Sequence, residues 1–267
     1  MAASDKRSVL GTQVDATTYA AAVDEIAAAA RDGRPMAVTA LAVHGVIESH
    51  RQEWLRAELN DFDLVAPDGQ PVRWALNLLH KAGLSDRVYG PLLTIKVLER
   101  MAAEGLPVYF YGSTAETLEA LQKQLAEQIP ELRIAGAEAS QFRLSEDDDA
   151  HLIAERVKAS GARVLFVGLG CPRQEQFVYQ MRPHLDMPQL AVGAAFDYHA
   201  GNLRIPPPWM QRAGLEWLWR LGLEPKRLWR RYVLLNPLYV SLLAAQWLRL
   251  WRPGPAKPGP EPRRFPV

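Results

Sequence analysis

Short apolar runs alternate with amphipathic runs along most of this sequence, and that alternation restricts the fold more than any other feature. An Ala-rich run that begins at Ala16 ends at Gly33, where a helix would terminate. A second helical run covers residues 43–59. The apolar runs are typical of buried strands and cover residues 35–43, 62–66, 106–112, 131–136, 162–170 and 189–197. The sequence therefore predicts an α/β fold, with a mostly parallel, Rossmann-like sheet flanked by helices on both faces.

Start signals mark the helices that separate the later strands. Ser113 and Glu116 have the spacing of a capping box ahead of "AETLEALQKQLAEQ". Ser145 and the acidic run 146–149 suit the positive N-terminal end of a helix that continues through "HLIAERVKAS". Pro172 suits the first turn of the helix that follows the strand at 162–170. These positions agree with a chain in which strands and helices alternate.

Charge and cysteine content narrow the class of protein. The formal net charge of +1 argues against a whole-surface nucleic-acid binder, so we expect no nucleic-acid partner. Cys171 is the only cysteine, which excludes an internal disulfide and favours a reducing compartment. The N-terminal run "MAASDKRSVLGTQVD" does not have the pattern of a signal peptide. No uninterrupted apolar run reaches the ~20 residues that a membrane-spanning helix needs.

The composition changes after residue 204. We divide the chain into an α/β core at 1–204, a helical Arg/Trp-rich appendage at 205–251 and a disordered Pro/Gly-rich tail at 252–267. Tryptophans beside arginines in the appendage are typical of an element that lies on a membrane surface. The alternative is that the tryptophans pack the appendage onto the core. The tryptophans concerned are Trp217, Trp219, Trp229, Trp247 and Trp251.

Several polar residues stand at the carboxyl ends of the predicted strands. Ligands of open α/β sheets bind at that edge. These residues are far apart in the sequence, but the fold would bring them to one edge of the sheet. They are Thr39, Asp68, Ser113, Gly168, Gly170 and Asp197. We expect the functional site there.

The loop "VGLGCPRQEQ" follows one of these strands. Gly168 and Gly170, between a strand and a helix N-terminus, would let backbone N–H groups approach a phosphate. The loop does not have the G-x-G-x-x-G pattern, so a dinucleotide site is poorly supported. Gln174 and Glu175 fall in the first helical turn, where they either reach a ligand or only cap the helix. Their spacing alone does not separate the two interpretations.

Two other kinds of chemistry receive little support. Cys171 precedes a helix N-terminus, which would make it a candidate nucleophile, but a small residue in a tight loop is the simpler interpretation. His44 and His50 form the only close histidine pair and do not have the spacing of a zinc site. We expect no metal site.

Asp68 and three arginines are harder to place from local sequence. An Asp in "Pro67-Asp68-Gly69" is most often a turn residue, and only its place at the strand end suggests chemistry. Arg220, Arg227 and Arg230 are spaced as if on one helical face, which Pro225 would interrupt. Arginine suits bidentate contact with phosphate.

Five motifs in fixed order resemble one family of bacterial enzymes. They are "LVAPDGQPVRW", "DRVYGPLL", "LFVGLGCPRQEQF", "AVGAAFDYHAG" and "AGLEWLWRLGLEPKRLWRRY". Together they are similar to the WecG/TagA/CpsF glycosyltransferases, over about residues 9–240. That family includes N-acetylmannosaminyltransferases of teichoic acid synthesis and enzymes of exopolysaccharide synthesis.

The resemblance implies an activity and roles for individual residues. It implies a metal-independent inverting transferase without a cofactor, which moves a sugar from a UDP-sugar donor to a polyprenyl-diphosphate-linked acceptor. It places the enzyme in the cytoplasm, peripheral on the inner face of the cell membrane, and leaves a homo-oligomer open. Asp68 matches the family's general base. Thr39, Arg87 and Gln174 match other active-site positions, Asp197 a position near the nucleotide, and Arg220, Arg227 and Arg230 the arginines that hold the donor diphosphate.

The sequence departs from the family pattern in two motifs. Leu41 stands where many members have an amide, and Pro91 and Leu92 follow "RVYG" where many have an Asp. The "RVYGP" form is more similar to the exopolysaccharide branch, where a hexose is the donor sugar. The alternative is an N-acetylmannosaminyl or N-acetylmannosaminuronyl transferase. Two rivals of other classes are a Rossmann-type oxidoreductase and a non-catalytic membrane scaffold that binds nucleotide sugars.

Overall fold

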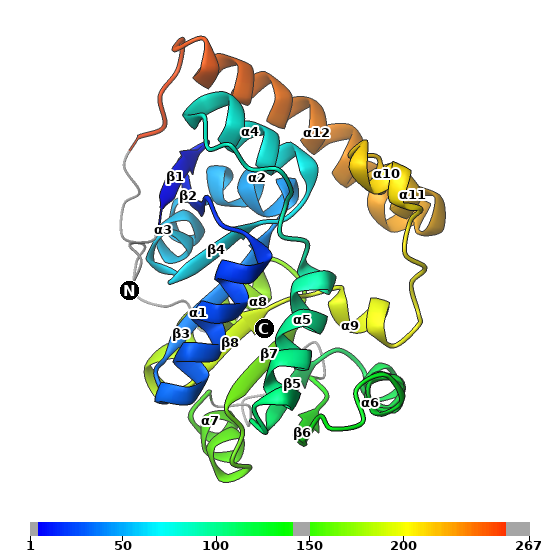
Figure 1. Cartoon of the computed structure of the whole chain (residues 1–267). Helices are drawn as coiled ribbons and strands as arrows, with labels where there is room; N and C mark the ends of the chain where they lie inside the picture. Colours follow the sequence, from blue (N-terminus) through cyan, green and yellow to red (C-terminus); the bar gives the residue numbers. More distant parts are fainter. Residues whose placement is uncertain (1–4, 141–149, 255–267) are drawn as a thin grey trace.

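A six-stranded parallel sheet lies at the centre of the computed structural model, which describes residues 5–140 and 150–254 (Figure 1). The side chains of Ala150, Pro208, Arg227, Arg230 and Arg231 are outside that description. The strand order is β4-β3-β8-β7-β5-β6, and all neighbouring pairs are parallel. The strands are β3 (Met36–Leu41), β4 (Leu64–Pro67), β5 (Val108–Gly112), β6 (Ile134–Glu138), β7 (Val164–Gly168) and β8 (Pro188–Ala191).

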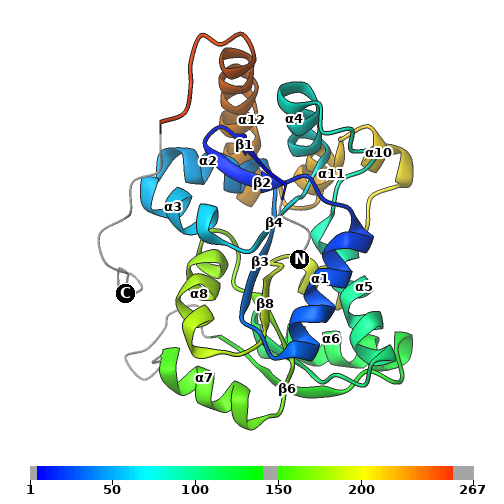
Figure 2. The same ribbon diagram turned by 60° about the vertical axis from the view of Figure 1, so that its left-hand side comes forward.

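Helices cover both faces of the sheet, as Figure 2 shows. One face packs against α1 (Tyr19–Asp32), α5 (Gly90–Ala103), α6 (Ala115–Gln128) and α9 (Ala195–His199). The other packs against α2 (Val43–Arg51), α3 (Glu53–Asp61), α4 (Gln70–His80), α7 (Ala150–Ala159) and α8 (Arg173–Met181), which the 3-10 helix η1 (Arg182–His184) follows. A mostly parallel α/β sheet between helices was predicted and is confirmed.

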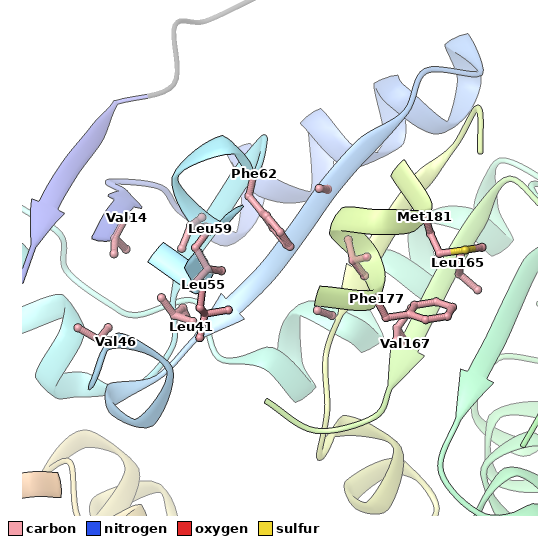
Figure 3. Packing of buried hydrophobic residues seen from close by; sticks show 14 of the residues in the cluster. Val14, Leu41, Val46, Leu55, Leu59, Phe62, Leu165, Val167, Phe177 and Met181 are labelled. Carbon is pink, nitrogen blue, oxygen red and sulfur yellow. The ribbon is translucent and has the colours of Figure 1, made fainter. Parts of the chain in front are cut away.

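The buried strands explain why the sheet is covered on both sides. Adjacent residues of a strand point to opposite faces. Phe110 of β5 therefore belongs to one core cluster, while Tyr111 belongs to the other. On the second face, Phe177 and Met181 of α8 lie beside the strand β7 (Figure 3). Apolar residues at nearly every strand position are what a parallel sheet requires.

The predicted end of α1 is correct, whereas the predicted start of α6 is shifted by one residue. Helix α1 ends at Gly33, which adopts a left-handed conformation with φ 62°. The predicted capping box at Ser113 is wrong by one residue. Thr114 is the N-cap of α6, and its Oγ1 accepts a hydrogen bond from the Thr117 N–H at 3.2 Å. The Ser113 N–H instead donates to the Gly168 carbonyl at 2.9 Å, which ties the end of β5 to β7.

The structure contains more helices and strands than the sequence predicted. The predicted helix at 43–59 is two helices, α2 and α3, separated at Gln52. A hairpin of β1 (Lys6–Val9) and β2 (Thr12–Asp15) and the helices α4 and α5 were not predicted. The helix start predicted at Ser145 and the acidic run 146–149 lie outside the described residues.

Three helices follow the sheet: α10 (Pro208–Arg212), α11 (Glu216–Leu223) and α12 (Pro225–Trp247). The second half of α12 packs on α2 and α4, and Leu235 and Tyr239 are buried in the core (Figure 1). The Tyr239 hydroxyl donates to the Pro71 carbonyl at 3.0 Å. The division at residues 204 and 251 and the membrane role stay predictions, and most of the predicted tail, 255–267, lies outside the described residues. Among the described helices, none combines the length and apolar character needed to cross a membrane.

Candidate active site

The carboxyl ends of β3, β8 and β7 frame the site. Strand β8 leads to α9 on one face of the sheet, whereas its neighbours β3 and β7 lead to α2 and α8 on the other. Chain segments that leave neighbouring strands toward opposite faces open a crevice at the strand ends, where α/β proteins bind ligands. The structure places Asp68 and Gly168 at the carboxyl ends of their strands, and Thr39 within β3, two residues before its last residue Leu41.

Asp68 follows the last residue of β4 and precedes α4. Its N–H donates to the Leu41 carbonyl at 3.1 Å, which continues the pairing of β4 with β3 past the strand end. Gly69 has φ 86°, a conformation that glycine adopts readily, so the chain can turn at once into α4. The Gly90 N–H approaches Asp68 Oδ2 at 3.4 Å. The turn therefore holds the carboxylate at the sheet edge.

The electrostatic setting of Asp68 suits a proton acceptor. Burial raises the pKa of Asp68 to about 6, the positive charge of Arg87 acts in the opposite direction, and Glu216 adds to the increase. The Gly90 N–H and Arg220 also act to lower the pKa. A carboxylate with a pKa near 6 is ionised at neutral pH and is more basic than an ordinary aspartate.

Arg87 joins the loop before α5 to helix α11. Its Nη1 and Nη2 atoms donate to the two carboxylate oxygens of Glu216, the first residue of α11. The Arg87 guanidinium carbon lies 4.3 Å from the centre of the Tyr89 ring, an arrangement that favours a cation–π contact. Tyr89 is hydrogen-bonded to Tyr198 of α9, and the two rings meet edge to face at 6.0 Å. Arg87 thus belongs to a cluster that surrounds Asp68.

Arg220 reaches the same cluster from α11. Its charge acts to lower the pKa values of Asp68 and Tyr198. Its Nη2 lies 3.7 Å from Glu224 Oε2, and its buried Nε has no hydrogen-bond partner among the described residues. The single helical face predicted for the three arginines is wrong. Because α11 ends at Leu223 and α12 begins at Pro225, Arg220 is on one helix, and Arg227 and Arg230 are on the next.

A second cluster lies at the start of α8. Glu175 is buried, and its Oε1 accepts hydrogen bonds from the Thr39 hydroxyl at 3.0 Å and from Gln174 Nε2 at 2.9 Å. Gln174 Oε1 in turn accepts the Gly170 N–H at 3.1 Å. Burial raises the pKa of Glu175, and these hydrogen bonds and the neighbouring Cys171 thiol act to lower it. Gln174 therefore shapes the glycine loop, and Glu175 connects α8 to β3.

The two loop glycines have different reasons to be glycine. A Cβ atom on Gly168 would lie 2.6 Å from the Phe196 ring, so close packing excludes a side chain there. Gly170 has φ 78° and open space where its side chain would be. The structure therefore gives Gly168 a packing role and leaves room for a ligand over Gly170. A ligand role for either glycine stays a prediction.

Asp197 is in α9, not at the strand end itself. Its Oδ1 accepts from Asn202 Nδ2 at 3.5 Å, and it stands next to Tyr198 of the Asp68 cluster. The side chains of Arg227 and Arg230 lie outside the described part, so their diphosphate role stays a prediction. Within residues 5–140 and 150–254, no three His, Cys, Asp or Glu side chains gather as a metal site would require.

The sequence did not single out three members of the site. Glu216, Tyr89 and Tyr198 all contribute to the surroundings of Asp68. Each stands inside a motif that carried the family resemblance, in "LEW", "VYG" and "DYH". Their positions in those motifs could have indicated that they belong to the site. The residues that they contact became evident only from the fold.

Comparison with known proteins identifies the family. The family described as "Glycosyl transferase WecG/TagA/CpsF family" matches residues 7–253. A relative from Bacillus spizizenii, an N-acetylglucosaminyldiphosphoundecaprenol N-acetyl-beta-D-mannosaminyltransferase, is 32% identical over 187 residues, which is 69% of each chain. The resemblance carried by the five motifs is confirmed: this chain belongs to the WecG/TagA/CpsF family and is a glycosyltransferase.

Proposed function

We propose that the enzyme transfers a sugar from a UDP-sugar donor to a polyprenyl-diphosphate-linked acceptor, with inversion at the anomeric carbon and with Asp68 as the general base. The observation that carries this proposal is the setting of Asp68. It is a carboxylate at the edge of the sheet, its pKa is raised to about 6, and arginines from two elements act on it. This is the environment that a base for an acceptor hydroxyl requires.

The transfer uses one proton acceptor and one charged leaving group. The acceptor hydroxyl oxygen attacks the anomeric carbon while its proton moves to Asp68 Oδ1 or Oδ2. The bond between that carbon and the β-phosphate oxygen breaks, and UDP leaves with the bonding electrons. One sugar is thereby joined to the acceptor with the opposite configuration at the anomeric carbon.

The departing diphosphate needs positive charge around it. Arg220 faces the Asp68 cluster, and α12 carries Arg227 and Arg230 in its first turns. The backbone N–H groups at the start of α8, behind the open loop at Gly170, provide a second source of positive potential. Such preorganised groups can stabilise a developing negative charge without a metal ion.

Exposed apolar side chains on the C-terminal helices support binding at a membrane surface. Trp209, Trp229 and Leu234 are 58%, 47% and 60% exposed, on α10 and α12. Trp74 on the adjoining α4 is 43% exposed. An apolar surface beside arginines suits the interface of an anionic membrane. We propose that this surface brings the site to its lipid-linked acceptor on the cytoplasmic side.

The donor sugar has two candidates. The name of the Bacillus spizizenii relative favours N-acetylmannosamine, with an acceptor that ends in N-acetylglucosamine. The departure at Leu41 favours a hexose, as in exopolysaccharide synthesis. In the structure, the Leu41 side chain is buried against Gly45 of α2 and belongs to the core cluster. Its position therefore provides no polar contact for an acetamido group.

A donor and acceptor screen tests the proposal. UDP-N-acetylmannosamine, UDP-glucose and UDP-glucuronate would each be mixed with short polyprenyl-diphosphate glycans, and products would be identified by mass. We expect one UDP-sugar to give a lipid-linked product, also in the presence of a chelator. Sugar binding without any product would favour the non-catalytic scaffold, and loss of transfer on chelation would contradict metal independence.

A further inference from the structure

We propose that Glu216 is a positioning residue, which docks α11 against the catalytic edge through Arg87 and so fixes Arg220 beside Asp68. Arg87, in this arrangement, acts mainly by holding α11. The inference rests on the proposed function only for its activity measurement. It concerns a residue outside the set that the sequence pointed to.

The contact between the two residues has a single well-defined geometry. Both terminal nitrogens of Arg87 are directed at both carboxylate oxygens of Glu216, and the two residues are 129 positions apart in the chain. The side chains are 4% and 15% exposed, so water does little to weaken the pair. The ring of Tyr89 lies against the Arg87 guanidinium and restricts its rotation. A planar fork that is held this way specifies both distance and orientation.

The ion pair of Arg87 with Glu216 also connects α11 to the loop before α5. Elsewhere, Trp219 Nε1 donates to the Arg204 carbonyl at 3.1 Å, which connects α11 only to the segment that leads into α10. Gly214, between α10 and α11, lies close to Trp74 of α4. Removing one member of a buried ion pair leaves the other charge unpaired, which is strongly unfavourable. Helix α11 also packs on α12, where the Trp217 and Tyr232 rings lie 5.7 Å apart. Loss of Glu216 should therefore loosen the first turn of α11 against the catalytic edge while α11 stays packed on α12.

Arg220 depends on this docking because of helix geometry. Residues four apart lie on the same face of a helix, so Glu216 and Arg220 face the core together. The pairing of Glu216 with Arg87 then sets where the Arg220 guanidinium stands relative to Asp68. Both Nη atoms of Arg87 are directed at Glu216. The buried Nε of Arg220, in contrast, has no hydrogen-bond acceptor among the described residues.

Hydrogen exchange and kinetics on the full-length protein test the proposal. We expect Glu216→Gln to increase amide exchange in residues 216–223 while exchange in the sheet stays unchanged. Transfer should fall by roughly 10²-fold, mainly in kcat, because a small misplacement of an oriented charge has that effect. Glu216→Asp should recover part of the loss, and the exchanged pair Arg87→Glu with Glu216→Arg should exceed either single variant in transfer.

A second ion pair with two hydrogen bonds, which is partly exposed and far from α11 in the sequence, provides the control. Arg156 on α7 donates through Nε and Nη2 to Glu138 on β6 at 3.0 and 2.6 Å. Glu138→Gln should change neither transfer nor exchange in α11. Unchanged α11 exchange in Glu216→Gln would overturn the proposal, as would faster transfer, which would mean that Glu216 restrains Arg87. If the wild-type enzyme transfers no sugar, the proposed function fails, and the exchange result still decides the docking role.

Discussion

Among single residues, Asp68 bears the chemistry of the proposed transfer. We expect Asp68→Asn to lower kcat by roughly 10²–10⁴-fold, because an amide cannot take the acceptor proton. Asp63, five positions earlier, provides a control at the other end of β4, where its Oδ2 accepts the Ala37 N–H at 2.7 Å and lies 3.6 Å from Arg182 Nη1. Asp63→Asn keeps an acceptor oxygen and should leave transfer within about threefold. A similar loss in both variants would mean that Asp68 has only a structural role.

The raised pKa of Asp68 also predicts a stability effect. Because its pKa is about 6 in the folded protein and 3.8 as the ordinary value, the folded state binds more protons between these values. Stability from this group therefore decreases as pH rises from about 4 to 6, and the full penalty is present above 6. Asp68→Asn should be more stable than wild type at pH 8 by about 1–3 kcal/mol, and equal to it near pH 3.5. Urea unfolding at both pH values measures this, and a variant that is less stable at pH 8 would contradict it.

Glu175 offers a separate test at the second cluster. Glu175→Ala would leave the Thr39 hydroxyl and the Gln174 amide without their buried acceptor, which costs about 1–3 kcal/mol. Glu175→Gln retains a carbonyl oxygen that can accept from Thr39 and should be close to wild type in stability. Urea unfolding of the two variants distinguishes them. Equal destabilisation would show that the negative charge, not the hydrogen bonding, matters here.

The residues that the sequence pointed to are those whose position in the α/β pattern suggests a role. Asp68, Thr39 and Gln174 stand at strand ends or in the first helical turn, and the α/β pattern brings such positions together. The role of Glu216 depends on a contact with Arg87 across 129 positions. Neither its neighbours in sequence nor its helical spacing indicates that partner, so sequence reasoning missed it.

Among the elements, helix α6 allows the contributions of Ser113 and Thr114 to helix capping to be compared. Thr114→Ala should lower the free energy of unfolding by about 1 kcal/mol, because its Oγ1 satisfies the Thr117 N–H. Ser113→Gly should not destabilise, since Ser113 has φ 60°, a conformation that glycine adopts more readily. Thermal unfolding monitored by circular dichroism compares the two. A larger loss for Ser113→Gly would restore the capping box predicted from the sequence.

Strands could be predicted better than helices in this chain, for a physical reason. Strands of a parallel sheet are buried on both faces, so β5 and β7 are continuous apolar runs that stand out from their surroundings. Helices α4 and α5 have prolines, Pro71 and Pro91, in their first turns, and the turn at Asp68 and Gly69 precedes α4 directly. These prolines are the same start signal as Pro172, but the turn at Pro67-Asp68-Gly69 favoured a loop interpretation for the residues before α4. The split between α2 and α3 at Gln52 likewise has no Gly or Pro to mark it.

At the scale of the whole molecule, the strand order determines which residues meet. The connection from β4 to β5 passes over β3, β8 and β7, and β8 returns to lie between β3 and β7. Only this order brings Thr39 on β3 next to Glu175 on the helix that follows β7. Sequence patterns predict that strands share an edge, but not which strands are neighbours. The second half of α12, packed on α2 and α4, was hidden for the same reason.

The exposed tryptophans of the C-terminal helices should contribute to lipid binding. Replacing both Trp209 and Trp229 with Ser removes two large exposed apolar side chains from α10 and α12. We expect the double variant to bind vesicles that contain anionic lipid more weakly, by about 1 kcal/mol or more for each ring withdrawn from the interface. Vesicle flotation measures the bound fraction, and transfer to a short-chain, water-soluble acceptor measures the chemistry separately.

A control variant separates membrane binding from general surface effects. Leu152 on α7 is 50% exposed, and α7 lies at the opposite end of the molecule from α12 (Figure 1). Leu152→Ser should leave flotation unchanged. If the tryptophan variant floats as well as wild type, the exposed rings do not bind lipid, and the proposed membrane surface is wrong. If it floats less but still modifies the soluble acceptor at the wild-type rate, the C-terminal helices bring a complete active site to the membrane, and Arg220 remains docked beside Asp68 away from lipid.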